Sequence, residues 1–276
     1  MATLRTIALH SYKGGTGKTT LIANIAAMYA KNGFNVALLD FDLYAPSLGS
    51  YFKKKPNTFL NDLLNGQAKI SDILYDLTKE VGLKGKFLVG FSSSRKEDVN
   101  EIEVKHDSKW QLEALRRFIK AKKELSDQFK IDYLFIDTSP GIRYWSINSL
   151  ACADLIFLLL KDSDMDVEGT QKMIVDIYDS LSRYGAKYYI ILNKVPGETV
   201  KEESVKIKDE KSWITELERV VGAEIVGSIP CFCDIQFSRH EYLFSVRQPT
   251  HPFAIRLEKI AETIKKLSET TPNNAL

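Results

Sequence analysis

Short apolar runs rich in branched residues alternate along the chain with longer segments whose apolar positions recur at helical spacing. Continuous apolar runs of this length predict strands buried on both faces, because a strand with one solvated face alternates apolar and polar residues. The predicted strands are Arg5–Leu9, Asn35–Leu39, Lys86–Phe91, Tyr133–Ile136, Leu155–Leu160, Lys187–Leu192 and Glu224–Ser228. The predicted helices are Lys18–Asn32, Ser108–Phe129, Arg143–Ala151, Asp166–Tyr184, Lys211–Val220 and Phe253–Ser268.

Strands that alternate with helices predict an α/β fold, with a doubly wound, mostly parallel sheet flanked by helices in three α/β/α layers. The polar, charged stretches Ser92–Lys109 and Pro196–Lys211 are interpreted as surface excursions rather than linkers. We therefore expect one domain over residues 1–276, with a polar tail at 270–276.

Composition limits the partners and the location that we expect, but it does not indicate a function. Hydrophobic residues make up 44% and charged residues 27% of the chain, and 38 Lys and Arg face 36 Asp and Glu. A net charge of +2 does not predict nucleic acid or an anionic membrane as partner, so either would need a local patch. An odd number of cysteines, 3, does not predict a disulfide framework. The N-terminus has no leader pattern, and Leu155–Leu160 is too short to span a membrane, so we expect a soluble, cytoplasmic protein.

The first predicted strand leads directly into the sequence KGGTGKTT at residues 13–20, and a helix follows. Glycines let backbone N–H groups close around phosphate oxygens, and the helix N-terminus adds its dipole. Lys18 is expected to reach the β- and γ-phosphates, and the Thr19 hydroxyl to ligate Mg²⁺. The predicted nucleotide contacts in this loop are Gly14, Gly15, Thr16, Gly17, Lys18, Thr19 and Thr20. Tyr12 departs from the simple pattern G-x-x-x-x-G-K-[ST], which has glycine there.

Carboxylates follow two of the other predicted strands. Asp40 and Asp42 come after Asn35–Leu39, and Asp137 ends the strand that begins at Tyr133. Side chains at the carboxyl edge of an open parallel sheet face its ligand crevice. Phosphoryl transfer to water needs positioning and neutralised charge, so Asp42 is predicted to orient the attacking water, and Asp40 and Asp137 to hold Mg²⁺ through its water shell. For one of Asp40 and Asp42, a turn or cap residue is the alternative.

With Tyr12 in place of glycine and the extra lysine Lys13, the loop resembles the deviant phosphate loop of the MinD/ParA family of ATPases. The resemblance covers nearly the whole chain: the loop, DFD at 40–42, DTSPG at 137–141, NK at 193–194 and IP at 229–230 occur in family order. It implies that Lys13 crosses a dimer interface to the partner's phosphates and that Asp42 is the catalytic aspartate. It further implies ATP with Mg²⁺, an ATP-bound homodimer, and slow hydrolysis that a protein partner stimulates.

The segment at 193–196 bears on the choice of base. GTPases read guanine with N-K-x-D, and Pro196 stands where that aspartate would accept from guanine, so ATP is favoured over GTP. The resemblance implies that Asn193 contacts adenine and that Pro230 of the IP segment lines the base, with Lys194 beside them. A turn residue at a strand end is the alternative for Asn193.

Two functions are consistent with these motifs. The favoured one is a positioning ATPase of ParA/MinD type, acting in chromosome or plasmid segregation, in division-site placement or on another cellular structure. The alternative is a carrier or scaffold ATPase of the same superfamily, with a protein or metal cluster as cargo, although the C-x-x-C of cluster carriers is missing. A bacterial tyrosine kinase is a third option, but the C-terminus has no tyrosine cluster.

Other residues are interpreted as structural. Cys231 and Cys233 are expected to be buried without a ligand, because two thiols cannot complete a zinc site, and His10 is expected to pack at a strand end. Arg116, Lys120 and Lys123 share a helix face, predicted to be solvated, which leaves nonspecific DNA open as a partner. The last helix lacks the basic amphipathic extension of a direct membrane anchor.

Overall fold

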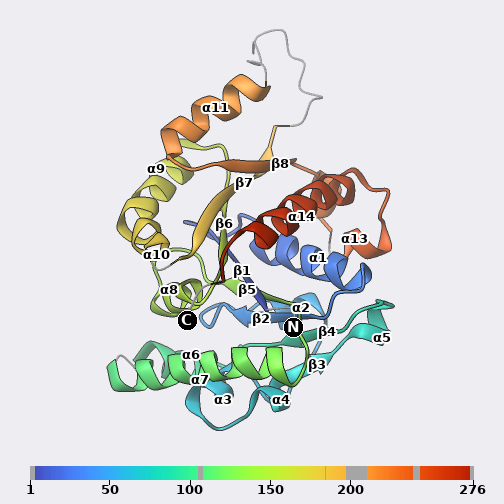
Figure 1. The fold of residues 1–276 in the computed structure, drawn as a ribbon, viewed down its shortest axis with the longest axis vertical. Helices are drawn as coiled ribbons and strands as arrows, with labels where there is room; N and C mark the ends of the chain where they lie inside the picture. Colours follow the sequence, from blue (N-terminus) through green and yellow to red (C-terminus); the bar gives the residue numbers. More distant parts are fainter. Residues whose placement is uncertain (1–3, 105–107, 184, 197–209, 239–242, 274–276) are drawn as a thin grey trace.

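The computed structural model describes residues 4–104, 108–183, 185–196, 210–238 and 243–273. One sheet of 8 strands runs through the molecule in the order β3-β4-β2-β5-β1-β6-β7-β8 (Figure 1). Its strands are β1 Arg5–His10, β2 Val36–Phe41, β3 Leu74–Asp76, β4 Phe87–Gly90, β5 Tyr133–Thr138, β6 Leu155–Leu160, β7 Lys187–Val195 and β8 Ile225–Pro230. Neighbouring strands are parallel, except that β3 runs antiparallel to β4. The predicted mostly parallel α/β sheet is confirmed.

Every predicted strand is present, and the sequence missed only β3 among the described strands. This edge strand has 3 residues, and none of them is fully buried. A strand so short and so partly covered has no apolar run that could reveal it.

The helices cover both faces of the sheet. In chain order they are α1 Lys18–Lys31, α2 Leu48–Tyr51, α3 Leu60–Asn65, α4 Ile70–Ile73, α5 Thr78–Val81, α6 Lys96–Val104, α7 Ser108–Asp127, α8 Tyr144–Ala151, α9 Asp164–Met173, the π-helix η1 Ile174–Tyr178, α10 Asp179–Ser182, α11 Glu210–Val221, α12 Cys233–Gln236, α13 Phe244–Arg247 and α14 Pro252–Thr270. The long helix predicted from Asp166 is thus three consecutive pieces, α9, η1 and α10. The short helices were not predicted, because one turn leaves no periodicity to detect.

Two parts of the chain differ from the surface excursions that we expected. Within Ser92–Lys109 the structure contains α6, and Ser92 and Ser93 are buried rather than solvated. The many charges of α6 conceal its helical spacing in the sequence. Most of the second predicted excursion, residues 197–209, lies outside the described residues.

The beginning of the predicted polar tail is attached to the domain. α14 continues to Thr270, and Arg5 Nη1 donates a hydrogen bond of 2.7 Å to the carbonyl of Thr271, whose side chain is buried. This end of the chain therefore closes over the start of β1. None of the described helices combines the length and the apolar character that a membrane span requires.

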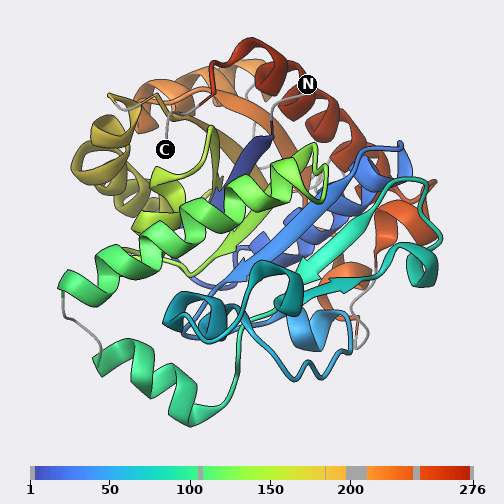
Figure 2. The ribbon, with the colours of Figure 1, turned by 60° about the horizontal axis from the view of Figure 1, so that its bottom comes forward.

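Successive side chains of a strand enter different cores. In β1, Ile7 and Leu9 pack with α1 and α14, whereas Ala8 belongs to the core beneath α7, α8 and α9. Figure 2 shows α7 lying across one face of the sheet, with α1 and α14 on the other. Burial on both faces explains why the strands are continuously apolar. Because β1, β2, β5, β6, β7 and β8 are parallel, their carboxyl ends meet at one edge, where the functional segments gather.

Candidate functional site

The loop from β1 to α1 needs its glycines for two different reasons. Gly15 (φ 72°) and Gly17 (φ 99°) both have left-handed backbone, which favours glycine. At Gly17 a Cβ would also lie 2.6 Å from Asn193 Nδ2. Of the predicted nucleotide contacts in this loop, Gly14 and Gly15 are exposed, Thr16 and Lys18 are buried, and Gly17, Thr19 and Thr20 are half-buried. The loop therefore combines an exposed glycine backbone with a buried lysine.

Lys18 begins α1 with its ammonium inside the protein. The side chain is 7% exposed, and Nζ donates to Ser11 Oγ over 3.1 Å. Burial lowers the pKa of Lys18, while the charges of Asp137 and Asp42 act in the opposite direction. A desolvated cation at the N-terminus of a helix, after a loop with exposed glycines, is suited to an anionic ligand, and above all to phosphate.

Asp40 and Asp137 form a buried carboxylate pair next to Thr19. Asp40 accepts hydrogen bonds of 3.1 Å from the backbone N–H groups of Asp42 and Leu48, and Asp137 accepts one of 2.6 Å from Thr19 Oγ1. Burial and then the neighbouring carboxylates raise the pKa of Asp40. Burial also raises the pKa of Asp137 to about 6, against the opposing charge of Lys18.

These oxygens fit a divalent cation. Oδ1 of Asp137 is buried and has no hydrogen-bond partner among the described residues. Two carboxylates and a threonine hydroxyl are the hard oxygen donors that Mg²⁺ prefers. A cation there would also offset the burial and the repulsion from neighbouring carboxylates that together raise both pKa values.

Asp42 joins the two switch segments, the name used here for DFD at 40–42 with the residues up to Ser47 and for DTSPG at 137–141 with the residues up to Arg143. Its Oδ1 accepts hydrogen bonds from Ser139 Oγ at 2.8 Å and from the backbone N–H of Ala45 at 3.0 Å. The guanidinium of Arg143 also lies over the ring of Tyr44, 4.8 Å from its centroid. The segment after β2 and the segment after β5 are thus joined by two polar contacts. Sequence reasoning missed Ser139, since a serine in a turn has many local roles.

A pocket beside the loop contains the residues predicted to contact the base. Its described lining is Gly17, Thr20, Leu21, Tyr51, Asn193, Lys194, Ile229, Pro230, Phe232, Ile235, Gln236, Ser238, Phe244 and Phe253. Asn193 Nδ2 donates to the carbonyl of Thr16 over 2.6 Å, which leaves its Oδ1 as an acceptor. Lys194 Nζ donates to the carbonyl of Gly15 over 3.1 Å. Segments far apart in sequence thus form one pocket next to the phosphate loop, with aromatic and aliphatic side chains beside polar ones, of a kind suited to a planar base.

Comparisons with known proteins agree with this arrangement. A family model described as an AAA domain matches residues 4–185, which hold the loop and both switch segments. An uncharacterized ATP-binding protein of Methanocaldococcus jannaschii is 25% identical over 274 residues, 96% of this chain and 90% of that protein. The septum site-determining protein MinD of Thermotoga maritima is 25% identical over 232 residues, 83% of this chain and 76% of that protein. MinD of Pyrococcus horikoshii, solved in complex with Mg-ADP, shares the fold with a TM-score of 0.72 at 22% identity, covering 96% of this chain and 97% of that one.

The chain belongs to the MinD/ParA family of P-loop ATPases. Its MinD/ParA loop carries Lys13 on the outer side. Lys13 Nζ lies 2.8 Å from Sδ of Met165 at the start of α9. Because a thioether is a weak acceptor, this contact holds the ammonium only loosely.

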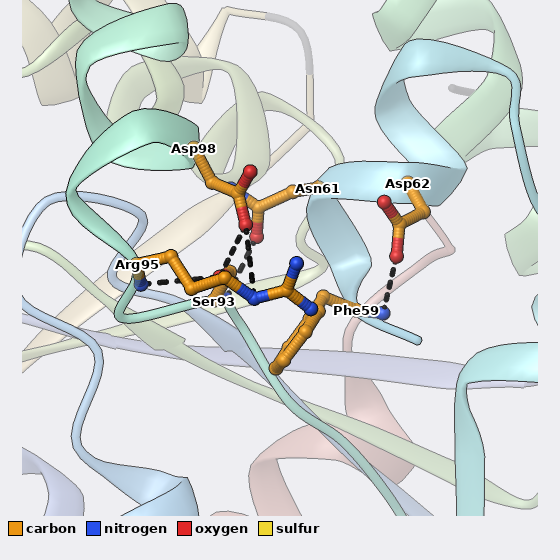
Figure 3. Close-up of polar contacts among 6 residues, drawn as sticks. All are labelled: Phe59, Asn61, Asp62, Ser93, Arg95 and Asp98. Carbon is orange, nitrogen blue, oxygen red and sulfur yellow. Dashed lines mark hydrogen bonds and ion pairs between the residues drawn. The ribbon is translucent and has the colours of Figure 1, made fainter. Parts of the chain in front are cut away.

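A cluster of polar side chains anchors the loop that follows β4 (Figure 3). The backbone N–H of Ser93 donates to Asn61 Oδ1 over 2.9 Å, and Ser93 Oγ donates to Asp98. This cluster ties the loop to α3 and α6. The preceding residue, Ser92, donates from Oγ to the carbonyl of Asp40. The segment that we expected to be a surface excursion, Ser92–Lys109, therefore begins with a buried serine that is hydrogen-bonded to Asp40, a predicted Mg²⁺ ligand.

The prediction that the two neighbouring cysteines are buried is wrong. Cys231 and Cys233 are exposed, whereas Phe232 between them lines the base pocket. In extended backbone successive side chains point to opposite sides, so turning Phe232 inward turns both thiols outward. No group of three or more His, Cys, Asp or Glu that could hold a metal occurs within the described part of the chain.

The predictions for His10 and for the basic residues of α7 agree with the structure. His10 is buried, and burial lowers its pKa to about 3, so the ring is neutral. Its Nδ1 donates to Thr138 Oγ1 over 2.7 Å, because that hydroxyl itself donates to the carbonyl of Leu9. On α7, Arg116, Lys120 and Lys123 are exposed as predicted.

Proposed function

We propose that this protein binds ATP with Mg²⁺, forms a homodimer while ATP is bound, hydrolyses it slowly and acts as a positioning switch of ParA/MinD type. The observation that carries the proposal is the hydrogen bond from Thr19 to Asp137 beside the buried Lys18 ammonium. It unites a phosphate-binding cation and Mg²⁺ ligands at one point, with Asp42 on the neighbouring segment.

Each residue has a distinct task in the proposed reaction. Lys18 binds the β- and γ-phosphate oxygens, and Thr19, Asp40 and Asp137 hold Mg²⁺, directly or through its water shell. When bound, the metal neutralises charge on the phosphates. Asp42 orients the attacking water, and Ser139 fixes the direction of its carboxylate. Asn193 Oδ1 accepts from the exocyclic amine of adenine, and Pro196 offers guanine no acceptor.

The face around Lys13 is suited to a second copy of the chain. Large apolar side chains are exposed there, with Ile142 56%, Tyr144 42% and Met165 65% exposed. Met165 contacts Lys13, and the turn before Ile142 is bound to the loop, since the N–H of Gly141 donates to the carbonyl of Ser11 over 2.8 Å. Exposed apolar groups around a loosely held cation support a dimer interface in which Lys13 reaches the partner's phosphates.

The proposed positioning role is supported by the similar proteins and not by the geometry of the nucleotide site. Relatives along most of the chain include a septum site-determining protein, which supports a role in cell organisation. We propose an activating protein partner that raises the slow hydrolysis rate, with nonspecific DNA as one candidate surface. A carrier or scaffold ATPase, the alternative, would use the same nucleotide site and differ in holding a cargo.

Nucleotide turnover tests the proposal first. Phosphate release from ATP should require Mg²⁺ and stop on addition of EDTA, because Asp40 and Asp137 bind the nucleotide only through the metal. GTP in about 10-fold excess should leave the ATP rate unchanged, since a lost hydrogen-bonded recognition pair costs well over that factor. Binding of GTP as tight as that of ATP, or turnover that does not depend on Mg²⁺, would contradict it.

Ser139→Ala is expected to lower kcat for ATP about 10-fold with KM within about 2-fold, the size of a lost hydrogen bond to a carboxylate. Ser139→Thr keeps a hydroxyl at the same place and is the matched control. Steady-state kinetics of both variants is the measurement. An unchanged kcat in Ser139→Ala, or an equal loss in both variants, would show that the hydroxyl does not position Asp42.

A further inference from the structure

Gly169 lies inside α9, where glycine has no backbone reason to occur. Its φ is not among the left-handed values of the described glycines. Glycine inside a helix costs about 0.5–1 kcal/mol relative to alanine. The reason is space: a Cβ at this position would lie 2.5 Å from Cγ of Tyr12, and closer still to Cδ1 and Cε1. The ring of Tyr12 therefore packs directly on the backbone of α9.

The neighbours of Tyr12 contact the same helical segment. Lys13 reaches Met165, which lies one helical turn before Gly169 and hence on the same face of α9. His10 meets Tyr178 of η1 edge to face, with ring centroids 6.2 Å apart. The start of the phosphate loop is thus held along α9 and η1 by contacts of three residues, His10, Tyr12 and Lys13.

We propose that Tyr12 and Gly169 form a positioning contact that presents Lys13 to the nucleotide of a second copy of this chain. The inference rests on the proposed function, because Lys13 has this task only in an ATP-bound dimer. The packed ring fixes the backbone one residue before Lys13. Within the described part of the chain, the ammonium has the weakly accepting sulfur of Met165 as its hydrogen-bond partner, so it can exchange that sulfur for a phosphate oxygen while the backbone stays in place. Such preorganisation lowers the cost of ordering Lys13 on association.

The contact also explains the departure from the simple loop pattern. Tyr12 stands where glycine is usual, and its side chain needs room outside the loop. Gly169, at the matching point of α9, supplies that room. Tyr12 and Gly169 are therefore complementary in size, and the effect of replacing one of them should depend on whether the other is present.

A double-mutant cycle tests the proposal, carried out on the full chain with Asp42→Ala to block hydrolysis. The variants are Gly169→Ala, Tyr12→Gly and their combination, and the readout is the dimer Kd in saturating Mg-ATP. With Tyr12 present, Gly169→Ala should weaken dimerisation at least about 10-fold, because the new methyl group displaces the ring. With Tyr12→Gly, the same change should alter the dimer Kd less than about 2-fold.

Two further readouts separate positioning from folding. Binding of a fluorescent ADP analogue to monomeric Gly169→Ala should stay within about 2-fold of the parent, since a purely structural defect would weaken both steps. Gly169→Ala should lower Tm with Tyr12 present and raise it with Tyr12→Gly, where only the better helix propensity of alanine acts.

The outcomes are distinct. Equal effects of Gly169→Ala in both backgrounds, or no loss of dimerisation with Tyr12 present, would overturn the positioning contact. If the Asp42→Ala parent does not dimerise in Mg-ATP, the proposed function fails and the role assigned to Lys13 falls with it. In that case the Tm cycle still decides whether Tyr12 and Gly169 are coupled.

Discussion

Replacing Asp42 with alanine is expected to lower the rate of ATP turnover at least about 100-fold, the usual contribution of a residue that orients or activates the attacking group. ATP should still bind, because Lys18, Thr19 and Asp137 are unchanged by this substitution. Asp42 is half-buried, and among the described contacts its carboxylate accepts hydrogen bonds only from Ser139 and Ala45. Phosphate release and equilibrium binding of ATP, measured on the same preparation, check both halves of the expectation.

The matched control for Asp42 is Asp127→Ala, the same change at an exposed position at the end of α7. It should leave turnover unchanged. Turnover by Asp42→Ala within about 5-fold of the parent would remove Asp42 from the reaction. Loss of ATP binding together with turnover would instead mean that Asp42 serves to hold the loop structure.

Lys13→Ala is expected to prevent the ATP-bound dimer and to lower turnover about 1,000-fold, the scale of a cation supplied in trans to a transferring phosphoryl group. Binding of ADP to the monomer should be retained, because Lys13 points outward to Met165 and not toward the loop interior. Sedimentation in Mg-ATP, combined with phosphate release, measures both effects.

Lys172→Ala is the matched control for Lys13, since Lys172 is an exposed lysine of α9, the helix that Lys13 contacts. It should dimerise and turn over like the parent. Dimerisation of Lys13→Ala as strong as that of Asp42→Ala would contradict the interface that we propose.

The sequence alone predicted what is local and periodic. The parallel strands appear as apolar runs, and the loop, Asp40 and Asp137 follow strand ends, so their convergence is a consequence of parallel topology. The structure brings all three to one edge of the sheet, with Thr19 bonded to Asp137.

Contacts between distant segments could not be predicted in this way. Tyr12 on Gly169 and Ser139 on Asp42 depend on the exact placement of helices over the sheet, and the base pocket takes Phe244 and Phe253 from the last helices. Cys231 was misjudged for the same reason. Cysteine is usually buried, but here the inward direction is taken by Phe232.

ATP, and not ADP, is expected to join two copies of this chain. The most direct test is the mass of Asp42→Ala in solution, measured by light scattering after gel filtration in saturating Mg-ATP and again in Mg-ADP. We expect the mass of two chains with ATP and of one chain with ADP. The mass of a single chain in both nucleotides would contradict the proposed ATP-dependent dimer.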